Sequence, residues 1–287
     1  MDTSIFIQTL LNGLSLASLY ILMAIGLTYI FSIMRIVNFA HGEILMVGAY
    51  VSFFLIDHYH INFFLSMILS MVVIGLFGLF LEKVVFRPRK GEDLNLLVLS
   101  LGLAITLQSS AMLVFTTEDR GLKPIFSGVF NVSDIFFSKV RFVAFIAAVV
   151  CILGSQLFLK KTRLGTALEA VSQDEEGASL QGIRINRYTA LTFAIGCSLA
   201  AAAGTLLAPI FVVSPFMGSL PVVKAFIVIV LGGLGSMMGA MMGGLILGIV
   251  ESVTGTYLGA TIQEVSGFLL LILVLIFKPG GMFGERE

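Results

Sequence analysis

Long apolar runs separated by short polar segments dominate this chain. A membrane-spanning helix needs about 20 mostly apolar residues, and few of these runs have the polar face of a helix from a soluble protein. By this measure the sequence predicts apolar helices at residues 5–34, 43–57, 63–86, 94–115, 140–159, 188–208, 222–252 and 260–277. We therefore expect an all-α integral membrane protein, a polytopic helical bundle of about eight spans with broken or re-entrant helices.

Glycines interrupt the run at 222–252, so the number of crossings there stays open. The preceding uncharged loop at 209–221 is expected outside and the C-terminal tail inside, which requires an odd number of crossings. If 222–252 is one helix, it and the last span make two crossings, which is an even number and does not fit. Two shorter crossings or a re-entrant hairpin would restore the parity, and re-entrant backbone requires protein or a water-filled cavity around it.

Composition supports the membrane interpretation. The 287 residues are 58% hydrophobic and 12% charged, with a mean hydropathy of +1.05, whereas soluble domains are about 25% charged. The formal net charge is zero, so charge gives no indication of a nucleic-acid partner. The N-terminus has no basic region, and the first apolar run is expected to be a retained span rather than a cleaved signal peptide.

Basic residues concentrate in certain loops and predict the orientation. Lys and Arg gather at 83–90, at 160–163, at 184–187 and in the tail, and such loops face the cytoplasm. The N-terminus and the loops 58–62, 116–138 and 209–221 are then expected outside.

A polar segment at 162–187, "TRLGTALEAVSQDEEGASLQGIRINR", stands out between two spans. Each charge would cost about 2.5–3.5 kcal/mol at the bilayer centre, so the segment must lie in water or on a partner. The pairs Thr166/Glu169 and Ser172/Glu175 read as capping boxes that start helices, and Gly182 is placed to end one. We expect two short helices or one kinked helix, with an apolar stripe at Leu164, Leu168, Val171, Ala178 and Leu180.

Two interpretations of the segment 162–187 remain open from these residues. It can be a solvated loop whose apolar stripe folds back on its own spans, or a docking element that enters a groove on a partner.

Three motifs in order resemble one family. The segment 162–187, the "NFAHG" stretch at 38–42, and the C-terminal "VIVLGGLGSMMGAMMGGLILGIVES" and "KPGGMFG" stretches are similar to the branched-chain amino acid permeases of ABC importers, the LivH-type family. In that family the segment inserts into a separate ATPase. The residues at matching positions, with the capping residue Glu169 added, are Gly165, Ala167, Glu169, Ala170, Gln173, Asp174, Ala178 and Gly182.

The resemblance implies a single transmembrane permease domain over residues 1–287, with 162–187 as the cytoplasmic coupling segment and 116–138 as an external loop. It implies ABC ATPase subunits, a second homologous permease subunit and an extracytoplasmic substrate-binding protein as partners in a bacterial inner membrane. The expected substrates are branched-chain or related amino acids, with urea or short amides as an alternative. The chain has no G-x-x-x-x-G-K-[ST] phosphate loop, so we expect neither an ATPase site nor a cofactor of its own.

Polar residues and glycines near both ends of the chain are candidates for the translocation path. The alternatives are an interfacial loop for the first group and close helix packing within one subunit for the glycines. An ionisable residue inside the membrane otherwise suggests function. The candidates are Asn38, His41, Glu43, Gly232, Gly233, Gly235 and Glu251.

A stand-alone secondary transporter or channel is the alternative function of a different class. Such a protein needs no docking element and more often carries buried ion-coupling acids. An enzyme is disfavoured because no nucleophile–base pair or metal-ligand spacing is visible.

Overall fold

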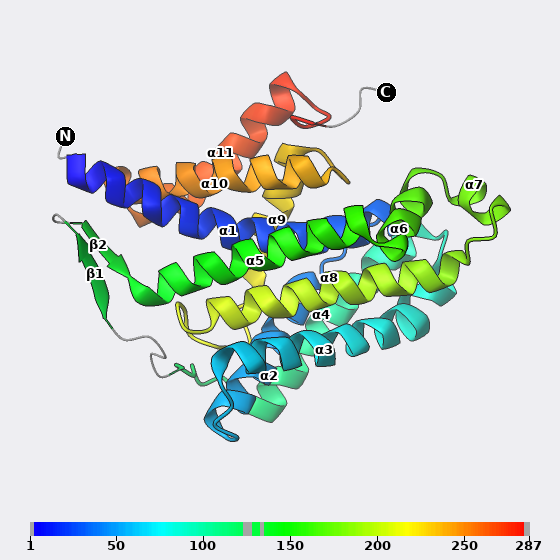
Figure 1. Cartoon of the computed structure of the whole chain (residues 1–287), viewed down its shortest axis with the longest axis horizontal. Coiled ribbons are helices and arrows are strands. Elements are labelled where there is room, and N and C mark those ends of the chain that lie inside the picture. The colour runs from blue at the N-terminus through cyan, green and yellow to red at the C-terminus, as the bar shows by residue number, and fades with distance from the viewer. Residues whose placement is uncertain (1–2, 123–127, 133–134, 284–287) are drawn as a thin grey trace.

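The computed structural model describes residues 3–122, 128–132 and 135–283. Figure 1 shows a helical bundle with most helices aligned along the long axis of the molecule. Its elements are α1 (Thr3–Met34), α2 (His41–Asp57), α3 (Phe63–Leu81) with its π-helical and 3-10 extensions Glu82–Phe86 and Arg87–Arg89, α4 (Asp93–Phe115), β1 (Val129–Val132), β2 (Ile135–Ser138), α5 (Lys139–Lys161), α6 (Arg163–Gln173), α7 (Glu175–Leu180), α8 (Ile185–Leu207), α9 (Ser219–Gly232), α10 (Met237–Leu258) and α11 (Ala260–Phe277).

The prediction of a polytopic helical membrane protein is confirmed. Among the described residues, seven helices are long and apolar enough to cross a membrane. The outward faces of α4 and α11 carry large exposed apolar side chains such as Leu113 and Ile276, which is the composition expected where a helix contacts lipid. The all-α expectation needs one correction, because β1 and β2 form an antiparallel hairpin within the segment 116–138. Residues 123–127 and 133–134 of that segment lie outside the described residues.

The apolar run at 222–252 is divided between two helices. Helix α9 ends at Gly232, and a turn in which Gly233 and Gly235 have φ angles of 104° and 81° leads into α10. With 14 residues, α9 is about 21 Å long, less than the roughly 30 Å of the hydrocarbon core. The run is therefore not one continuous helix, and α10 but not α9 has the length of a full span.

Helices α1 and α8 form the centre of the bundle. Both are largely buried, and α1 packs against α5, α8, α9 and α10. Close backbone approach requires small residues: Gly26 of α1 faces Gly196 of α8, and Gly48 of α2 faces Ala201. The core is consequently a set of tight helix crossings that larger side chains would separate.

The glycines of α10 serve packing within this subunit. Gly243 faces Val228 of α9, whereas Gly244 and Gly248 face Ile21 and Ala17 of α1. The small residues thus place α10 between α9 and α1, as expected for closely packed helices in lipid.

We expect Gly248→Leu to destabilise the fold by about 1–3 kcal/mol or more, because overpacking forces helices apart. A Cβ atom at position 248 would lie 2.5 Å from the Ala17 backbone nitrogen. Thermal unfolding in detergent, followed by size-exclusion chromatography, measures the effect. The matched control is Gly102→Leu in α4, where a Cβ would meet nothing within 4 Å. Equal melting temperatures for the two variants would contradict this account of the α1–α10 crossing.

The loops sort to two ends of the molecule, as Figure 1 shows for the N-terminus and the hairpin at one end and α6 and α7 at the other. At the hairpin end, Arg120 and Val213 exchange two backbone hydrogen bonds of 2.9 Å, which joins the two loops expected outside. The opposite end, here called the basic end, carries Arg35, Lys83, Arg87, Arg89, Lys90, Lys160, Lys161, Arg163, Arg184, Arg187 and Lys278. The positive-inside rule assigns this basic end to the cytoplasm.

Candidate coupling segment and translocation path

The polar segment 162–187 folds into the two short helices α6 and α7, but the predicted capping boxes are wrong. The caps are Thr162, whose hydroxyl accepts the Gly165 N–H at 3.0 Å, and Asp174, whose carboxylate accepts the Gly177 N–H at 3.0 Å. Thr166 and Ser172 lie inside α6. The hydroxyl of Ser172 donates to the Glu169 carbonyl at 2.7 Å, so it is engaged with the preceding turn rather than with free N–H groups.

Gly182 ends α7 as predicted. Its φ is 82°, a conformation that glycine adopts without a steric cost. The Gly182 N–H donates to the Ser179 carbonyl at 2.9 Å and the Ile183 N–H to the Ala178 carbonyl at 3.1 Å. These two bonds define a Schellman motif, which satisfies carbonyls at the helix end.

The predicted apolar stripe is correct for part of its length. Leu168, Val171 and Ala178 are buried together with Ile33 near the end of α1. Leu164 is 41% exposed and Leu180 is 87% exposed, so the stripe does not include them. The buried members fix α6 and α7 onto α1, and Leu180 remains available on the outside of the segment.

The eight predicted coupling residues divide into internal and exposed positions. Gly165 is buried, and a Cβ there would lie 2.5 Å from the Phe158 carbonyl oxygen, so its role in this chain is the tight turn from α5. Ala178 is also buried. The remaining six are half-buried or exposed: Ala167, Glu169, Ala170, Gln173, Asp174 and Gly182. Sequence reasoning placed Leu180 in the buried stripe and so missed it as an outward-facing apolar residue.

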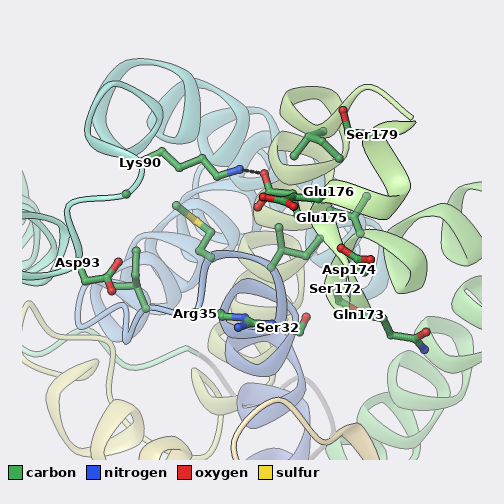
Figure 2. A pocket seen from close by; sticks show the side chains of 16 residues that line it. Ser32, Arg35, Lys90, Asp93, Ser172, Gln173, Asp174, Glu175, Glu176 and Ser179 are labelled. Carbon is green, nitrogen blue, oxygen red and sulfur yellow. Dashed lines mark hydrogen bonds and ion pairs between the residues drawn. The ribbon is translucent and has the colours of Figure 1, made fainter. Parts of the chain in front are cut away.

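A cavity of about 680 Å³ lies between the end of α1, the loop before α4, and the helices α6 and α7. We call it the basic-end pocket. Figure 2 shows Lys90 reaching across it to Glu175, with which it forms an ion pair. Arg35, Asp93 and Glu176 also line it. The pocket thus joins the coupling segment to two other parts of the bundle, a juxtaposition that the sequence did not reveal.

The first group of translocation candidates lies inside the bundle. After α1 ends, residues 35–40 turn back, and His41 packs with its ring 3.2 Å from the position of a Cβ on Gly26. Gly26 is about 12 Å from the end of α1 by helical rise. Asn38, His41 and Glu43 are at most 6% exposed. This burial argues against the interfacial-loop alternative and for a helix break within the protein.

The buried polar atoms of this group that lack hydrogen-bond partners among the described residues include Nδ2 of Asn38 and Oε2 of Glu43. Buried polar groups are usually hydrogen-bonded, and exceptions call for an explanation such as a functional role. The carbonyl oxygen of the Asn38 side chain accepts the Ala40 N–H at 3.1 Å, so its local role is to turn the chain into α2.

The start of α2 meets the start of α9. Gly42 and Gly218 are in backbone contact, since a Cβ on Gly218 would lie 2.5 Å from the Gly42 carbonyl carbon. The rings of Phe39 and Phe226 also pack 5.1 Å apart. The N-terminal end of α2, with Asn38 just before it and His41 and Glu43 in its first turn, therefore meets the N-terminal end of the short helix α9. In transporters, the N-termini of such half-helices point at the substrate.

The candidates at 232–235 lie at the other end of α9. There the tail donates to the last carbonyls of the helix, from the Met282 N–H to Leu231 at 2.8 Å and from the Phe283 N–H to Gly232 at 2.9 Å. A helix end without such donors would leave carbonyls unsatisfied in the bundle. Residues 278–283 of the tail thus close the C-terminal end of α9, which is separate from the group around His41.

Glu251 is the remaining candidate, and its carboxylate is occupied. The Lys224 ammonium pairs with Oε1 at 2.5 Å, and the Tyr20 hydroxyl donates to Oε2 at 2.7 Å. The two charged side chains are 9% and 1% exposed. This network ties α1, α9 and α10 together. Among the described residues, no group of three or more His, Cys, Asp or Glu side chains could hold a metal ion.

A bundle of apolar helices with breaks inside it and a folded polar segment at its basic end defines a polytopic membrane protein of the permease class. The chain belongs to the branched-chain amino acid transport system permease component family, whose family model matches residues 9–277. The resemblance found in the motifs is thereby confirmed.

Individual relatives support this assignment over the whole chain. The chain is 36% identical to the high-affinity branched-chain amino acid transport system permease protein BraD of Pseudomonas aeruginosa, over 98% of this chain and 97% of that protein. It is 38% identical to the permease protein LivH of Escherichia coli K12, over 98% and 96%. A solved structure, PsaBC from Streptococcus pneumoniae in complex with Fab, has a similar fold with a TM-score of 0.52, 15% identity and coverage of 95% and 92%.

Proposed function

We propose that this chain is the membrane-spanning subunit of an ATP-driven importer that moves branched-chain or related apolar amino acids into a bacterial cell across the inner membrane. The relatives carry this substrate in their names. The observation that carries the mechanism is the coupling segment, in which α6 and α7 are fixed to α1 by buried residues while Leu180 faces outward.

The proposed partners follow from the missing ATP-binding motif and from the similarity to other permease subunits. Without a phosphate loop, ATP hydrolysis falls to ATPase subunits that dock on α6 and α7 from the cytoplasm. A binding protein would deliver substrate at the hairpin end. A second permease subunit is supported by a further similarity, 24% identity over 93% of this chain, to the permease protein LivM of Salmonella typhimurium.

The fold offers a physical route from the ATPase to the substrate. Force on α6 and α7 reaches Ile33 through Leu168 and Val171. Ile33 lies in the last turn of α1, one residue before its end at Met34, and the segment 35–40 then leads to His41 and α2. Rocking of α1 would therefore shift the junction of α2 and α9, as alternating access requires two states with different contacts.

The decisive experiment is uptake of labelled leucine into proteoliposomes that contain the permease pair, with and without the ATPase subunits. Uptake that needs the ATPase, ATP and the binding protein supports the importer. Undiminished uptake without the ATPase would establish the stand-alone transporter instead. Competition by urea or a short amide in place of leucine would identify the alternative substrate class.

Leu180→Asp is expected to reduce ATP-driven uptake at least about tenfold. Burial of a leucine in a partner's groove contributes about 1.5–3 kcal/mol, and each 1.4 kcal/mol is tenfold. Because Leu180 is 87% exposed, the substitution removes little contact within the subunit. Co-purification of the ATPase should fall in parallel, and Leu180→Met should preserve both. Wild-type uptake in the aspartate variant would exclude Leu180 from the ATPase contact.

A further inference from the structure

We infer that the basic-end pocket is a binding site for a free zwitterionic α-amino acid with an apolar side chain, entered from the cytoplasm. The inference rests on three kinds of surface that meet in one cavity. They are an unpaired guanidinium, unpaired carboxylates and an apolar wall, and each matches one part of such a ligand.

The positive group is Arg35. It follows the last residue of α1 with a φ of 52°, a conformation that is uncommon for residues other than glycine. Its guanidinium forms no ion pair or hydrogen bond with the described residues, and Figure 2 shows it at the foot of the pocket. A planar guanidinium binds a carboxylate through two parallel hydrogen bonds.

The negative groups come from two other elements. Asp93 begins α4 and Glu176 lies in α7, and neither carboxylate is paired with a base in the part of the chain that the structure describes. The remaining pocket cation, Lys90, is already paired with Glu175. The carboxylates can therefore receive an ammonium group, while Arg35 is the cation left to receive a carboxylate.

The apolar wall is formed by Ile33, Ile36 and Val171, which line the pocket and are largely buried. An aliphatic side chain placed there would lose water-exposed surface, which favours binding. The volume of about 680 Å³ falls within the roughly 300–1,000 Å³ of ligand pockets.

The combination selects among ligand classes. A phosphate or nucleotide would face the carboxylates of Asp93 and Glu176 and be repelled. A simple cation would make no use of the guanidinium of Arg35, which is exposed and would stay hydrated. An apolar amino acid satisfies both charges and the wall together.

A ligand bound in the basic-end pocket would affect transport, because α1, α6 and α7 form its walls and are the elements proposed to move during the cycle. A ligand held between Arg35 and Glu176 would connect the end of α1 to α7, where at present Lys90 and Glu175 form the charged link to the loop before α4. Stabilising one position of the coupling segment would slow the cycle, so accumulated product would inhibit its own import. This consequence rests on the proposed function, whereas the binding does not.

Binding is tested on the purified permease–ATPase complex in nanodiscs, without nucleotide or binding protein, by calorimetric titration with L-leucine. We expect saturable binding that weakens at least tenfold in Arg35→Gln and in Asp93→Asn. The matched control is Arg184→Gln, an exposed guanidinium of the same end that does not line the pocket. Two probes that each lack one charge, 4-methylpentanoate and isoamylamine, should bind at least tenfold more weakly than leucine.

Several outcomes would overturn the inference. These are no leucine binding at millimolar concentration, unchanged binding in both pocket variants, an equal loss in Arg184→Gln, or isoamylamine binding as tightly as leucine. In proteoliposomes, leucine loaded inside should slow uptake by the wild type. In Arg35→Gln, uptake with internal leucine should nearly equal uptake without it. If the complex binds leucine but does not transport it, the importer proposal would be wrong and the pocket assignment would still stand.

Discussion

Replacing Lys224 with methionine is expected to destabilise the protein by about 3–5 kcal/mol, the effect of leaving a buried charge without its partner. Lys224 and Glu251 are 9% and 1% exposed and form an ion pair between α9 and α10. The ammonium of Lys224 also lies 3.4 Å from the Glu264 carbonyl oxygen of α11. In Lys224→Met, Glu251 would retain only the Tyr20 hydroxyl as a partner. A loss of about 3 kcal/mol is a large fraction of a typical total stability of about 5–15 kcal/mol, so the yield of folded protein should fall.

The double variant Lys224→Met/Glu251→Met provides the control. Replacing a whole buried ion pair by apolar residues of similar volume is often neutral or stabilising, so folding should return to within about 1–2 kcal/mol of the wild type, with the unpaired Tyr20 hydroxyl as the residual cost. Unfolding in denaturant and folded yield measure both. If the double variant transports leucine, the ion pair serves only to pack α9 against α10. If it is stable yet inactive, Glu251 belongs to the translocation path.

Glu43→Gln is expected to leave stability unchanged or raised while lowering uptake by about 100-fold. The Glu43 carboxyl group is 6% exposed, and its Oε2 has no partner among the described residues. Removing a buried charge that has no basic partner relieves a desolvation cost. On the proposed path, however, this is the negative group available to the ammonium of a substrate, and a lost buried charge pair of about 3 kcal/mol corresponds to roughly 100-fold.

The contrast with a paired carboxylate makes the experiment specific. Glu82 is buried and bound to the Arg87 guanidinium through both oxygens at 3.1 and 2.6 Å, so Glu82→Gln should lower the melting temperature. Glu43→Gln should not, and its loss of uptake should occur with the ATPase still bound. Wild-type uptake in Glu43→Gln would remove Glu43 from the path. A lowered melting temperature in Glu43→Gln would instead assign it a structural role at the start of α2.

Much of the coupling segment could be predicted because its signals are local. The cost of charge in a bilayer excludes residues 162–187 from the membrane, and Gly182 marks a helix end through its own backbone preference. The N-caps were misplaced because several of its side chains can accept a backbone N–H, and sequence alone does not rank them. The structure selects Thr162 and Asp174, the residues that begin α6 and α7.

The candidate path was less accessible to prediction. Asn38, His41 and Glu43 were recognisable as polar residues next to an apolar run. Their burial depends on the return of residues 35–40 toward Gly26 and on the contact between Gly42 and Gly218. Glu251 was recognisable as an ionisable residue in the membrane, but its partner Lys224 lies in another helix.

The sequence by itself determined the apolar helices, the basic end, and the existence of a folded polar segment, because hydrophobic transfer, charge placement and capping act over a few neighbouring residues. Only the tertiary structure decided which helices meet. It set the division of 222–252, the Lys224–Glu251–Tyr20 network, the closure of α9 by the tail and the basic-end pocket. The network, the closure of α9 and the pocket each join segments far apart in the chain, and the helices that carry them approach closely where small residues allow it.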